Sequence, residues 1–363
     1  MKRFLNITLS ALVVVASASV AKAGNPDRAG QAGATQLLIN GWSKSSGWGW
    51  AGVSNITGVE SMFMNVAGLA KSSPTEVQFS RTNWLSGSQI DINSFGISQK
   101  VNTDGYFGLS VMSFSMGDIE ITTEDQPDGG LGTYRPQFMN IGIGYGKRFS
   151  EAISVGILGR IVSEAIPNAK AQGMALDAGV QYVATANESS EVKKNDVHFG
   201  ISIKNIGPDM QYSGDGLSRK TIDRINGTEG TTDQRANRFN LPSLINIGAG
   251  YDFRLDADSQ TYFHKLTLAG NFTSHTFQNN EVTMGLEYSY KSILQVRTAY
   301  SFQEGGFDYE TRNSAYTGFS GGLSFNIPLS DEEEASAISV DYSYRATNPF
   351  DGTHSFGVRL NLR

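Results

Sequence analysis

The sequence predicts an all-β fold, a transmembrane antiparallel β-barrel of about 14 strands with an N-terminal plug segment. Three observations predict it. From residue 76 onward, stretches of roughly 10 to 14 residues alternate apolar and polar side chains and end in turn residues. The chain begins with a segment typical of an export signal. Long and short connections alternate in the way that outer-membrane barrels require.

The first 23 residues are predicted to be a signal peptide. Lys2 and Arg3 form a basic start, residues 9–20 form an apolar and small-residue run, and residues 21–23 form an A-x-A cleavage site. A membrane helix is the alternative, but the run is shorter than the roughly 20 apolar residues that a span needs. We expect the mature chain to begin at Gly24. Loss of the three basic residues changes the formal charge from -6 to -9.

Composition favours strands separated by tight turns. The chain has 41 glycines, 14 tyrosines, 20 phenylalanines and only 18% charged residues, which argues against disorder. It has no cysteine, so a hydrogen-bonded framework must supply the stability that disulfides give many exported proteins. Mild acidity without a basic cluster argues against a nucleic-acid partner.

The alternation of side chains defines the predicted strands. In residues 245–254, apolar residues at odd positions alternate with polar or small residues at even positions, and these two sets lie on opposite faces of a strand. A soluble sandwich has the same period, but spanning strands need about 9 to 11 residues and soluble strands favour about 5 or 6. The apolar set changes face near Phe95 and Met112. The predicted strands are 76–84, 90–101, 104–116, 136–149, 152–163, 173–185, 194–206, 242–254, 261–273, 280–291, 293–303, 316–327, 336–345 and 353–362.

Loop lengths predict an orientation. The connections after the third, seventh and eleventh strands are long, at residues 117–135, 207–241 and 304–315, whereas those after the second, fourth and tenth are very short. Outer-membrane barrels place long loops outside and short turns on the periplasmic side. We therefore expect a bacterial outer-membrane protein with both termini in the periplasm.

Charged residues within the strands fall on the polar face, which is the lumen of a barrel. A lipid-facing Arg or Lys at the membrane midplane would cost about 2–4 kcal/mol, so this partition has energetic meaning. The predicted lumenal charges are Arg160, Asp177, Lys204, Asp252, Glu287, Arg297, Asp341 and Arg359.

Residues 24–75 do not alternate, and they hold Trp42, Trp48 and Trp50. A fourteen-strand barrel is wider than the eight-strand kind that side chains can fill, so its lumen needs an occupant or forms a channel. We expect residues 24–75 to be a plug and residues 76–363 to be the barrel. Glycines at 142, 144, 146, 248 and 250 alternate with apolar residues, which favours close approach of this plug.

No catalytic, cofactor-binding or metal site is predicted. Residues 318–322 match the G-x-S-x-G pattern of hydrolases but lie in an alternating strand rather than a strand-to-helix turn. None of the four histidines has the spacing of a metal site. Acidic residues at 256–258 and 331–334 lack the glycine and terminal glutamate of a calcium loop, so we expect solvated turns.

Three N-terminal stretches, residues 30–39, 51–54 and 60–70, resemble the start of the PorV/PorQ family within the wider FadL-like barrel group. In that family an N-P-A-G-L run precedes the first long strand. The matching residues of this plug motif are Asn65, Ala67, Gly68 and Leu69, while Val66 replaces the usual proline.

The resemblance covers the first hundred or so residues by motif and the remainder by strand number and loop pattern. It implies a fourteen-strand barrel with an N-terminal hatch, in bacteria of the Bacteroidetes type. Family members are linked to the type IX secretion system, where PorV is a non-catalytic partner of the translocon and shuttles cargo with C-terminal signals.

The sequence thus favours a protein-binding accessory subunit of a secretion or surface-assembly machine, most closely type IX secretion. Its long loop carries five acidic and five basic residues between Asp209 and Arg238, so charge repulsion does not unfold it. A FadL-like transporter of hydrophobic small molecules and an accessory subunit of another outer-membrane complex are alternatives, and an enzyme is the least supported. The candidate partner-binding residues are Asp209, Arg219, Lys220, Arg224, Arg235 and Arg238.

Overall fold

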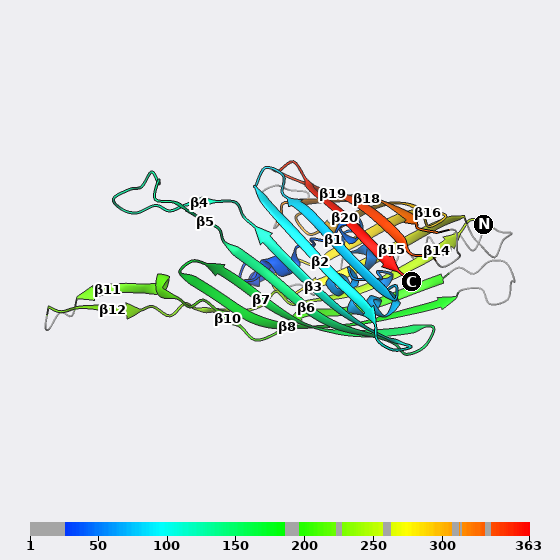
Figure 1. The fold of residues 1–363 in the computed structure, drawn as a ribbon, viewed down its shortest axis with the longest axis horizontal. Helices are drawn as coiled ribbons and strands as arrows, with labels where there is room; N and C mark the ends of the chain where they lie inside the picture. Colours follow the sequence, from blue (N-terminus) through cyan, green and yellow to red (C-terminus); the bar gives the residue numbers. More distant parts are fainter. Residues whose placement is uncertain are drawn as a thin grey trace.

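The computed structural model describes residues 26–185, 196–222, 227–256, 263–306, 312, 314–330 and 335–363. Fourteen long strands close into one antiparallel barrel in chain order, with the last strand paired to the first (Figure 1). The predicted signal peptide lies outside the described residues. The barrel strands are β1 (Thr75–Trp84), β2 (Ile90–Lys100), β3 (Gly105–Ser115), β6 (Gln137–Arg148), β7 (Ile153–Ile166), β8 (Ala169–Thr185), β9 (Asp196–Ile206), β14 (Leu244–Arg254), β15 (His264–His275), β16 (Glu281–Tyr290), β17 (Leu294–Gln303), β18 (Tyr316–Pro328), β19 (Ala337–Thr347) and β20 (Thr353–Leu362).

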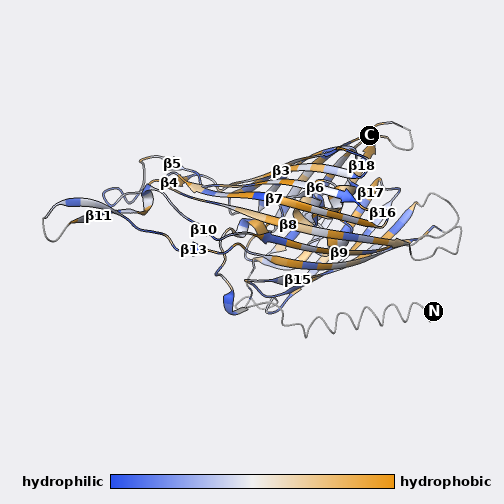
Figure 2. Cartoon of the chain, turned by 90° about the horizontal axis from the view of Figure 1, so that it is seen from below, coloured by the Kyte–Doolittle hydropathy of each residue, from blue (hydrophilic) through white to orange (hydrophobic). Residues whose placement is uncertain are grey.

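The strands form where the sequence alternates, so the prediction of an all-β barrel of about 14 strands is confirmed. In β14, Ile245 and Ile247 are exposed on the outer face, whereas Asn246 is buried on the inner face. Figure 2 shows hydrophobic residues, in orange, distributed along the barrel strands. Outside a membrane such an apolar surface would be unfavourable, and inside one it is what a spanning barrel requires.

One predicted connection is wrong. The sequence predicts a connection at residues 164–172, but β7 runs to Ile166 and β8 begins at Ala169, so the two strands meet in a tight turn. Several inner-face residues here are alanines, including the buried Ala171 and Ala175. Alanine is small and weakly apolar, so the contrast between the two faces fades and the sequence hides these strand ends.

The change of apolar face near Phe95 and Met112 has a packing cause. The pleat of β2 and β3 is unbroken, because ten consecutive residue pairs join them, yet Ile92, Met112 and Phe114 are buried on the inner face. These three residues pack into an apolar core with residues 26–74, which we call the N-terminal segment. The inner face is therefore apolar where it meets that core and polar elsewhere.

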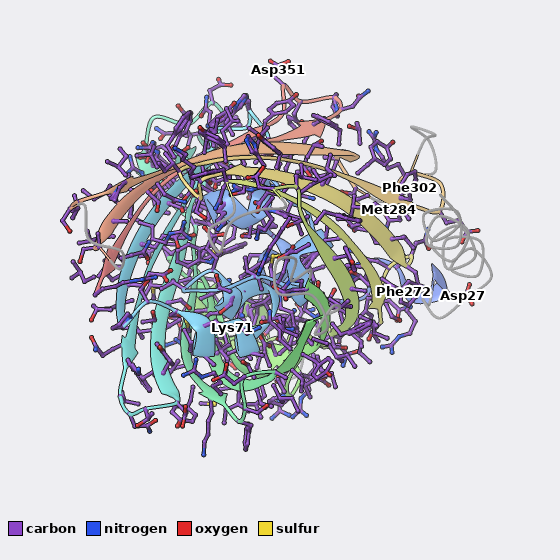
Figure 3. The ribbon with its side chains drawn as sticks, turned by 90° about the vertical axis from the view of Figure 1, so that its right-hand side faces the viewer. Asp27, Lys71, Phe272, Met284, Phe302 and Asp351 are labelled. Atoms are coloured by element: carbon purple, nitrogen blue, oxygen red, sulfur yellow. The ribbon has the colours of Figure 1, made fainter. Side chains whose placement is uncertain are left out.

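The N-terminal segment consists of short helices, of which the longest has six residues. Figures 1 and 3 show short helices of this segment inside the ring of strands, whereas Asp27, in the first of them, lies outside the ring in Figure 3. No helix in the described part of the chain is long and apolar enough to span a membrane. The helices are η1 (Pro26–Arg28), η2 (Thr35–Leu38), α2 (Ser43–Ser46), η3 (Ala51–Ser54), α3 (Ser61–Met64) and η4 (Val66–Lys71).

Two of the long loops form two-stranded hairpins that extend beyond the barrel at the same end (Figure 1). We call this end the loop end. The connection after β3 holds the first pair, and the connection after β9 holds the second pair together with a small third sheet and a short helix. These elements are β4 (Ile119–Glu120), β5 (Thr133–Tyr134), β10 (Met210–Gln211), η5 (Asp215–Leu217), β11 (Ser218–Ile222), β12 (Glu229–Asp233) and β13 (Arg238–Phe239).

Candidate functional site

The eight charged residues predicted for the lumen are all buried in the structure. The barrel geometry brings six of them together as three pairs of opposite charge from neighbouring strands. Burying a charge is costly unless an opposite charge and hydrogen bonds accompany it, which explains the pairing. The pairs are Arg160 with Asp177, Arg297 with Glu287, and Arg359 with Asp341.

Arg160 and Asp177 connect the wall to the N-terminal segment. Arg160 Nη2 donates to Asp177 Oδ2 at 2.8 Å, and the same nitrogen donates to the Met62 carbonyl oxygen at 3.3 Å. The backbone N–H of Asn205 donates to the other Asp177 oxygen at 2.7 Å, beside the irregular pairing between β8 and β9. The pair therefore fixes three segments at once.

Glu287 and Arg297 hold a tryptophan of the N-terminal segment. Arg297 Nε donates to Glu287 Oε2 at 2.9 Å, and Trp48 Nε1 donates to the same oxygen at 3.0 Å. Arg297 also donates to Ser324 Oγ at 2.9 Å. Because Trp48 is buried, this hydrogen bond satisfies the only polar atom of its ring.

Asp252 has partners that the sequence did not indicate. It lies 3.1 Å from His198 Nε2, 3.4 Å from Lys265 Nζ and 2.6 Å from Thr267 Oγ1. These side chains come from β9 and β15, the two strands on either side of β14. Adjacent inward positions on three strands explain the cluster, and the correct register of all three was needed to predict it.

Lys204 has no salt bridge within the described residues, although it is only 1% exposed. Its Nζ atom lies 4.0 Å from the ring centre of Phe63 and 4.8 Å from that of Trp50. Those two rings stack with 5.6 Å between centres. A cation over aromatic faces gains electrostatic attraction, so the aromatic residues of the N-terminal segment take the place of a carboxylate.

Sequence reasoning missed a buried carboxylate in the N-terminal segment. Glu60 accepts hydrogen bonds from the backbone N–H groups of Lys44 at 3.1 Å and Ser45 at 2.6 Å, and from Gln78 of β1. No periodic pattern surrounds Glu60, so nothing in the sequence marks it. Gln78, by contrast, lies in the alternating polar set of the first predicted strand, which could have placed it in the lumen.

The plug motif lies in and just before η4. Asn65 accepts a hydrogen bond from the Ala67 N–H at 3.2 Å and donates to the carbonyl oxygens of Val53 and Val180 at 3.0 and 3.1 Å. It therefore caps the short helix and joins it to β8. Gly68 lies so close to a neighbouring backbone that a Cβ atom would be 2.1 Å from a carbonyl oxygen. Ala67 and Leu69 are fully buried.

Glycines of the barrel wall provide the space for this motif. A Cβ atom at Gly156 of β7 would lie 2.4 Å from the Val66 carbonyl oxygen, and one at Gly179 of β8 would lie 2.0 Å from Asn65 Oδ1. A Cβ atom at Gly146 or Gly248 would lie 2.7 or 3.2 Å from a backbone nitrogen of the N-terminal segment. Gly144 and Gly250 meet side chains of the segment, so the predicted close approach is observed at four of the five glycines. The prediction is wrong for Gly142, where a Cβ atom would meet only Ser110 and Leu158 of the barrel itself.

The candidate partner-binding residues are spread over the loop between β9 and β14. Arg219 and Lys220 are exposed on β11, while Arg235 and Arg238 are exposed near the base of the hairpin. The latter two line an open cavity of about 660 Å³. Asp209 accepts a hydrogen bond from Asn240 in the same loop. Arg224 lies outside the described residues.

The G-x-S-x-G match lies within β18, as its alternation predicted. Ser320 is buried and shares the strand with Gly318, which has a φ of 104° at an irregular pairing with β19. A nucleophile elbow instead exposes its serine on a strand-to-helix turn. The motif therefore serves strand geometry here.

A closed barrel of antiparallel strands with an apolar outer face and a polar inner face is the architecture of an outer-membrane protein. More specifically, the chain belongs to the family described as type IX secretion system protein PorV, whose family model matches residues 23–272. Among curated proteins, none matches the chain in sequence.

A solved structure shows the same fold. The toluene transporter TodX of Pseudomonas putida is similar with 11% identity over 89% of this chain and 97% of its own, at a TM-score of 0.51. A FadL homologue of Pseudomonas aeruginosa has 12% identity over 88% of this chain and 98% of its own, at a TM-score of 0.47. The likeness to TodX shows a FadL-like barrel and, at this identity, nothing about a ligand.

Proposed function

We propose that this chain is a non-catalytic accessory subunit of the type IX secretion machine that binds a protein partner at its loop end. Membership of the PorV family supports the assignment to this machine. The observation that carries the binding role is the β11–β12 hairpin, which extends away from the barrel and pairs with no barrel strand. An isolated two-stranded hairpin is marginally stable in water, and its open edges can pair with another chain.

The base of this hairpin is held in a defined position, which suits a docking element. Met210 and Leu241 pack in a buried cluster with Leu37 of the N-terminal segment. The ring of Phe239 lies against Gly33, where a Cβ atom would be 2.1 Å from a ring carbon. The loop and the start of the N-terminal segment therefore form one packed unit, and the hairpin extends beyond it.

The two edges of the hairpin differ in charge. Arg219 and Lys220 lie on β11, whereas Glu229 and Asp233 lie on β12, and all four are exposed. Such an arrangement favours one orientation of a bound segment over the other, since like charges on neighbouring strands repel. In this proposal the loop end faces the cell exterior and both termini face the periplasm, as loop lengths in outer-membrane barrels favour.

Residues 26–74 act as a plug in the same proposal. Hydrogen bonds join them to Glu287, Arg160 and Ser202 of the inner wall, so polar contacts hold the segment against the lumen wall. This arrangement gives little support to transport of hydrophobic molecules, for which a lumenal apolar path would be needed. The protein-binding function is therefore preferred over the FadL-like transporter.

Affinity purification from native membranes tests the proposed function. The tagged full-length protein is solubilised gently, and co-purifying proteins are quantified by mass spectrometry. We expect a stoichiometric protein partner. Replacing residues 218–233 by a short Gly-Ser linker should remove it, because the free edges disappear. Emergence of the intact protein alone would contradict the proposal.

The matched control shortens the other hairpin, residues 119–134, in the same way. Both variants should keep the heat-dependent gel shift of a folded barrel, because neither hairpin pairs with a barrel strand. Retention of the partner by the variant lacking residues 218–233 would place the contact elsewhere and overturn the role of the β11–β12 hairpin.

A further inference from the structure

A cavity of about 390 Å³ lies at the loop end, between the N-terminal segment and the barrel wall. Its floor includes Leu38, Ile39 and Trp50 of the N-terminal segment, and its walls come from the loop-end residues of β1 and of β15 to β19. The volume is within the roughly 300–1,000 Å³ of small-molecule sites. A molecule that enters from the loop end therefore meets residues of both the wall and the N-terminal segment.

Aromatic rings and polar groups line this cavity together. Trp84 and Tyr316 face it from β1 and β18, and Trp84 Nε1 donates to the Tyr316 hydroxyl at 3.0 Å. The Arg345 guanidinium lies 3.8 Å from the ring centre of Tyr316, which holds that ring in place. Trp50 adds a third ring at the floor. The lining therefore offers fixed ring faces to a ligand.

The cavity wall contains a buried histidine. His275 is 6% exposed and lines the cavity, and its Nε2 atom has no hydrogen bond within the described residues. An unsatisfied buried polar group costs about 1–3 kcal/mol, which a ligand with a hydroxyl group would relieve. Glu281 and Gln278 lie in the same lining and offer further hydrogen-bonding groups.

The lining excludes two other ligand classes. A hydrocarbon would leave the buried Nε2 atom of His275 without a partner, so its binding would be penalised. A ligand of a single charge meets both Glu281 and Arg345, so attraction to one is offset by repulsion from the other. A neutral molecule with an apolar face and several hydroxyl groups fits both conditions.

We propose that this cavity binds a neutral saccharide of one or two sugar units. The C–H face of a pyranose ring packs against an aromatic ring, and its hydroxyl groups exchange hydrogen bonds with His275, Glu281 and Gln278. This site is separate from the β11–β12 hairpin, so it does not depend on the proposed protein partner.

Isothermal titration of the purified full-length protein in detergent tests the site. The probes are glucose, galactose, mannose, N-acetylglucosamine, maltose and toluene. We expect at least one sugar to bind and to change tryptophan fluorescence, because Trp50 and Trp84 line the cavity. Binding of toluene with no sugar binding, or binding of none of the probes, would overturn the proposal.

Two histidine variants locate the site. His275→Ala should weaken sugar binding about tenfold or more, since it removes a buried hydrogen-bonding group. His264→Ala is the matched control, because His264 is at the opposite end of the same strand. Each variant is first checked for the gel shift of a folded barrel. Equal sugar affinity in the folded His275→Ala variant and the parent would contradict the proposal.

Discussion

At the scale of single residues, glycines on the inner wall decide how closely the N-terminal segment approaches the barrel. On β7, Gly156 faces the segment, and a Cβ atom there would be 2.4 Å from a backbone oxygen that cannot move aside freely. Three residues further on, Gly159 faces outward, and its Cβ atom would meet only one side-chain carbon, at 4.0 Å. Two glycines of one strand thus have different roles.

Gly156→Val is therefore expected to displace the segment and to lower the free energy of unfolding by about 1–3 kcal/mol, the usual cost of overpacking. Urea titration followed by tryptophan fluorescence measures this, and limited proteolysis of residues 26–74 reports displacement. Gly159→Val should change neither quantity. Equal effects of the two substitutions would show that the segment does not contact the wall at Gly156.

Lys71 of the N-terminal segment makes the stability of the folded chain depend on pH. It lies within the ring of strands in Figure 3, and its Nζ donates to Gln181 at 3.1 Å. Burial lowers the pKa of Lys71 to about 8 from its ordinary value of 10.5. Between these values the unfolded chain binds a proton that the folded chain does not, so stability rises with pH across this window.

Lys71→Met should reduce that rise, because the methionine has no proton to lose. The measurement is the urea midpoint of unfolding at a series of pH values from 7 to about 11, which brackets the window between the two pKa values. Lys100→Met is the control, since Lys100 is exposed at the end of β2. An unchanged slope in Lys71→Met would contradict the buried position of the amine.

At the scale of elements, sequence alternation was sufficient for the strands and insufficient for the N-terminal segment. Ile245 and Asn246 alternate plainly, and their strand was predicted within two residues of its observed start. Glu60 has no periodic neighbours, since short helices expose no regular face. Its hydrogen-bond partners lie on β1 and α2, and local sequence patterns do not show that these elements come close to Glu60.

The outer face of the strands is expected to tolerate charge poorly. Ile201 is 50% exposed at the middle of β9, and Ile222 is 66% exposed on β11, beyond the barrel. Ile201→Arg should cost about 2–4 kcal/mol, because it places a charge in the hydrocarbon core of the membrane. Refolding into lipid vesicles at a series of urea concentrations measures it. Ile222→Arg should cost nothing measurable, and a comparable loss in both would contradict the assigned membrane face.

At the scale of the whole molecule, the N-terminal segment is joined to the inside of the wall by several kinds of contact. These are two of the charge pairs, the rings of Trp50 and Phe63 around Lys204, and the close approach at the glycines. The third charge pair, Arg359 with Asp341, links two strands of the wall. The individual charges could be predicted because each lies at a polar strand position. Their pairing could not, because it depends on the register of neighbouring strands and on where the segment lies. The filled lumen is thus the central claim about this barrel.

A disulfide test addresses that claim most directly, since the chain has no cysteine of its own. Ser43 Oγ of α2 lies 3.2 Å from Ser80 Oγ on the inner face of β1, whereas Phe79 is exposed on the outer face of the same strand. Cysteines at closely opposed positions can form a disulfide without a large backbone shift. The measurement is mass spectrometry of outer membranes from cells that express Ser43→Cys/Ser80→Cys or Ser43→Cys/Phe79→Cys. A disulfide in the first variant and none in the second is predicted; no disulfide in the first, or equal yields in both, would contradict a segment packed inside the barrel.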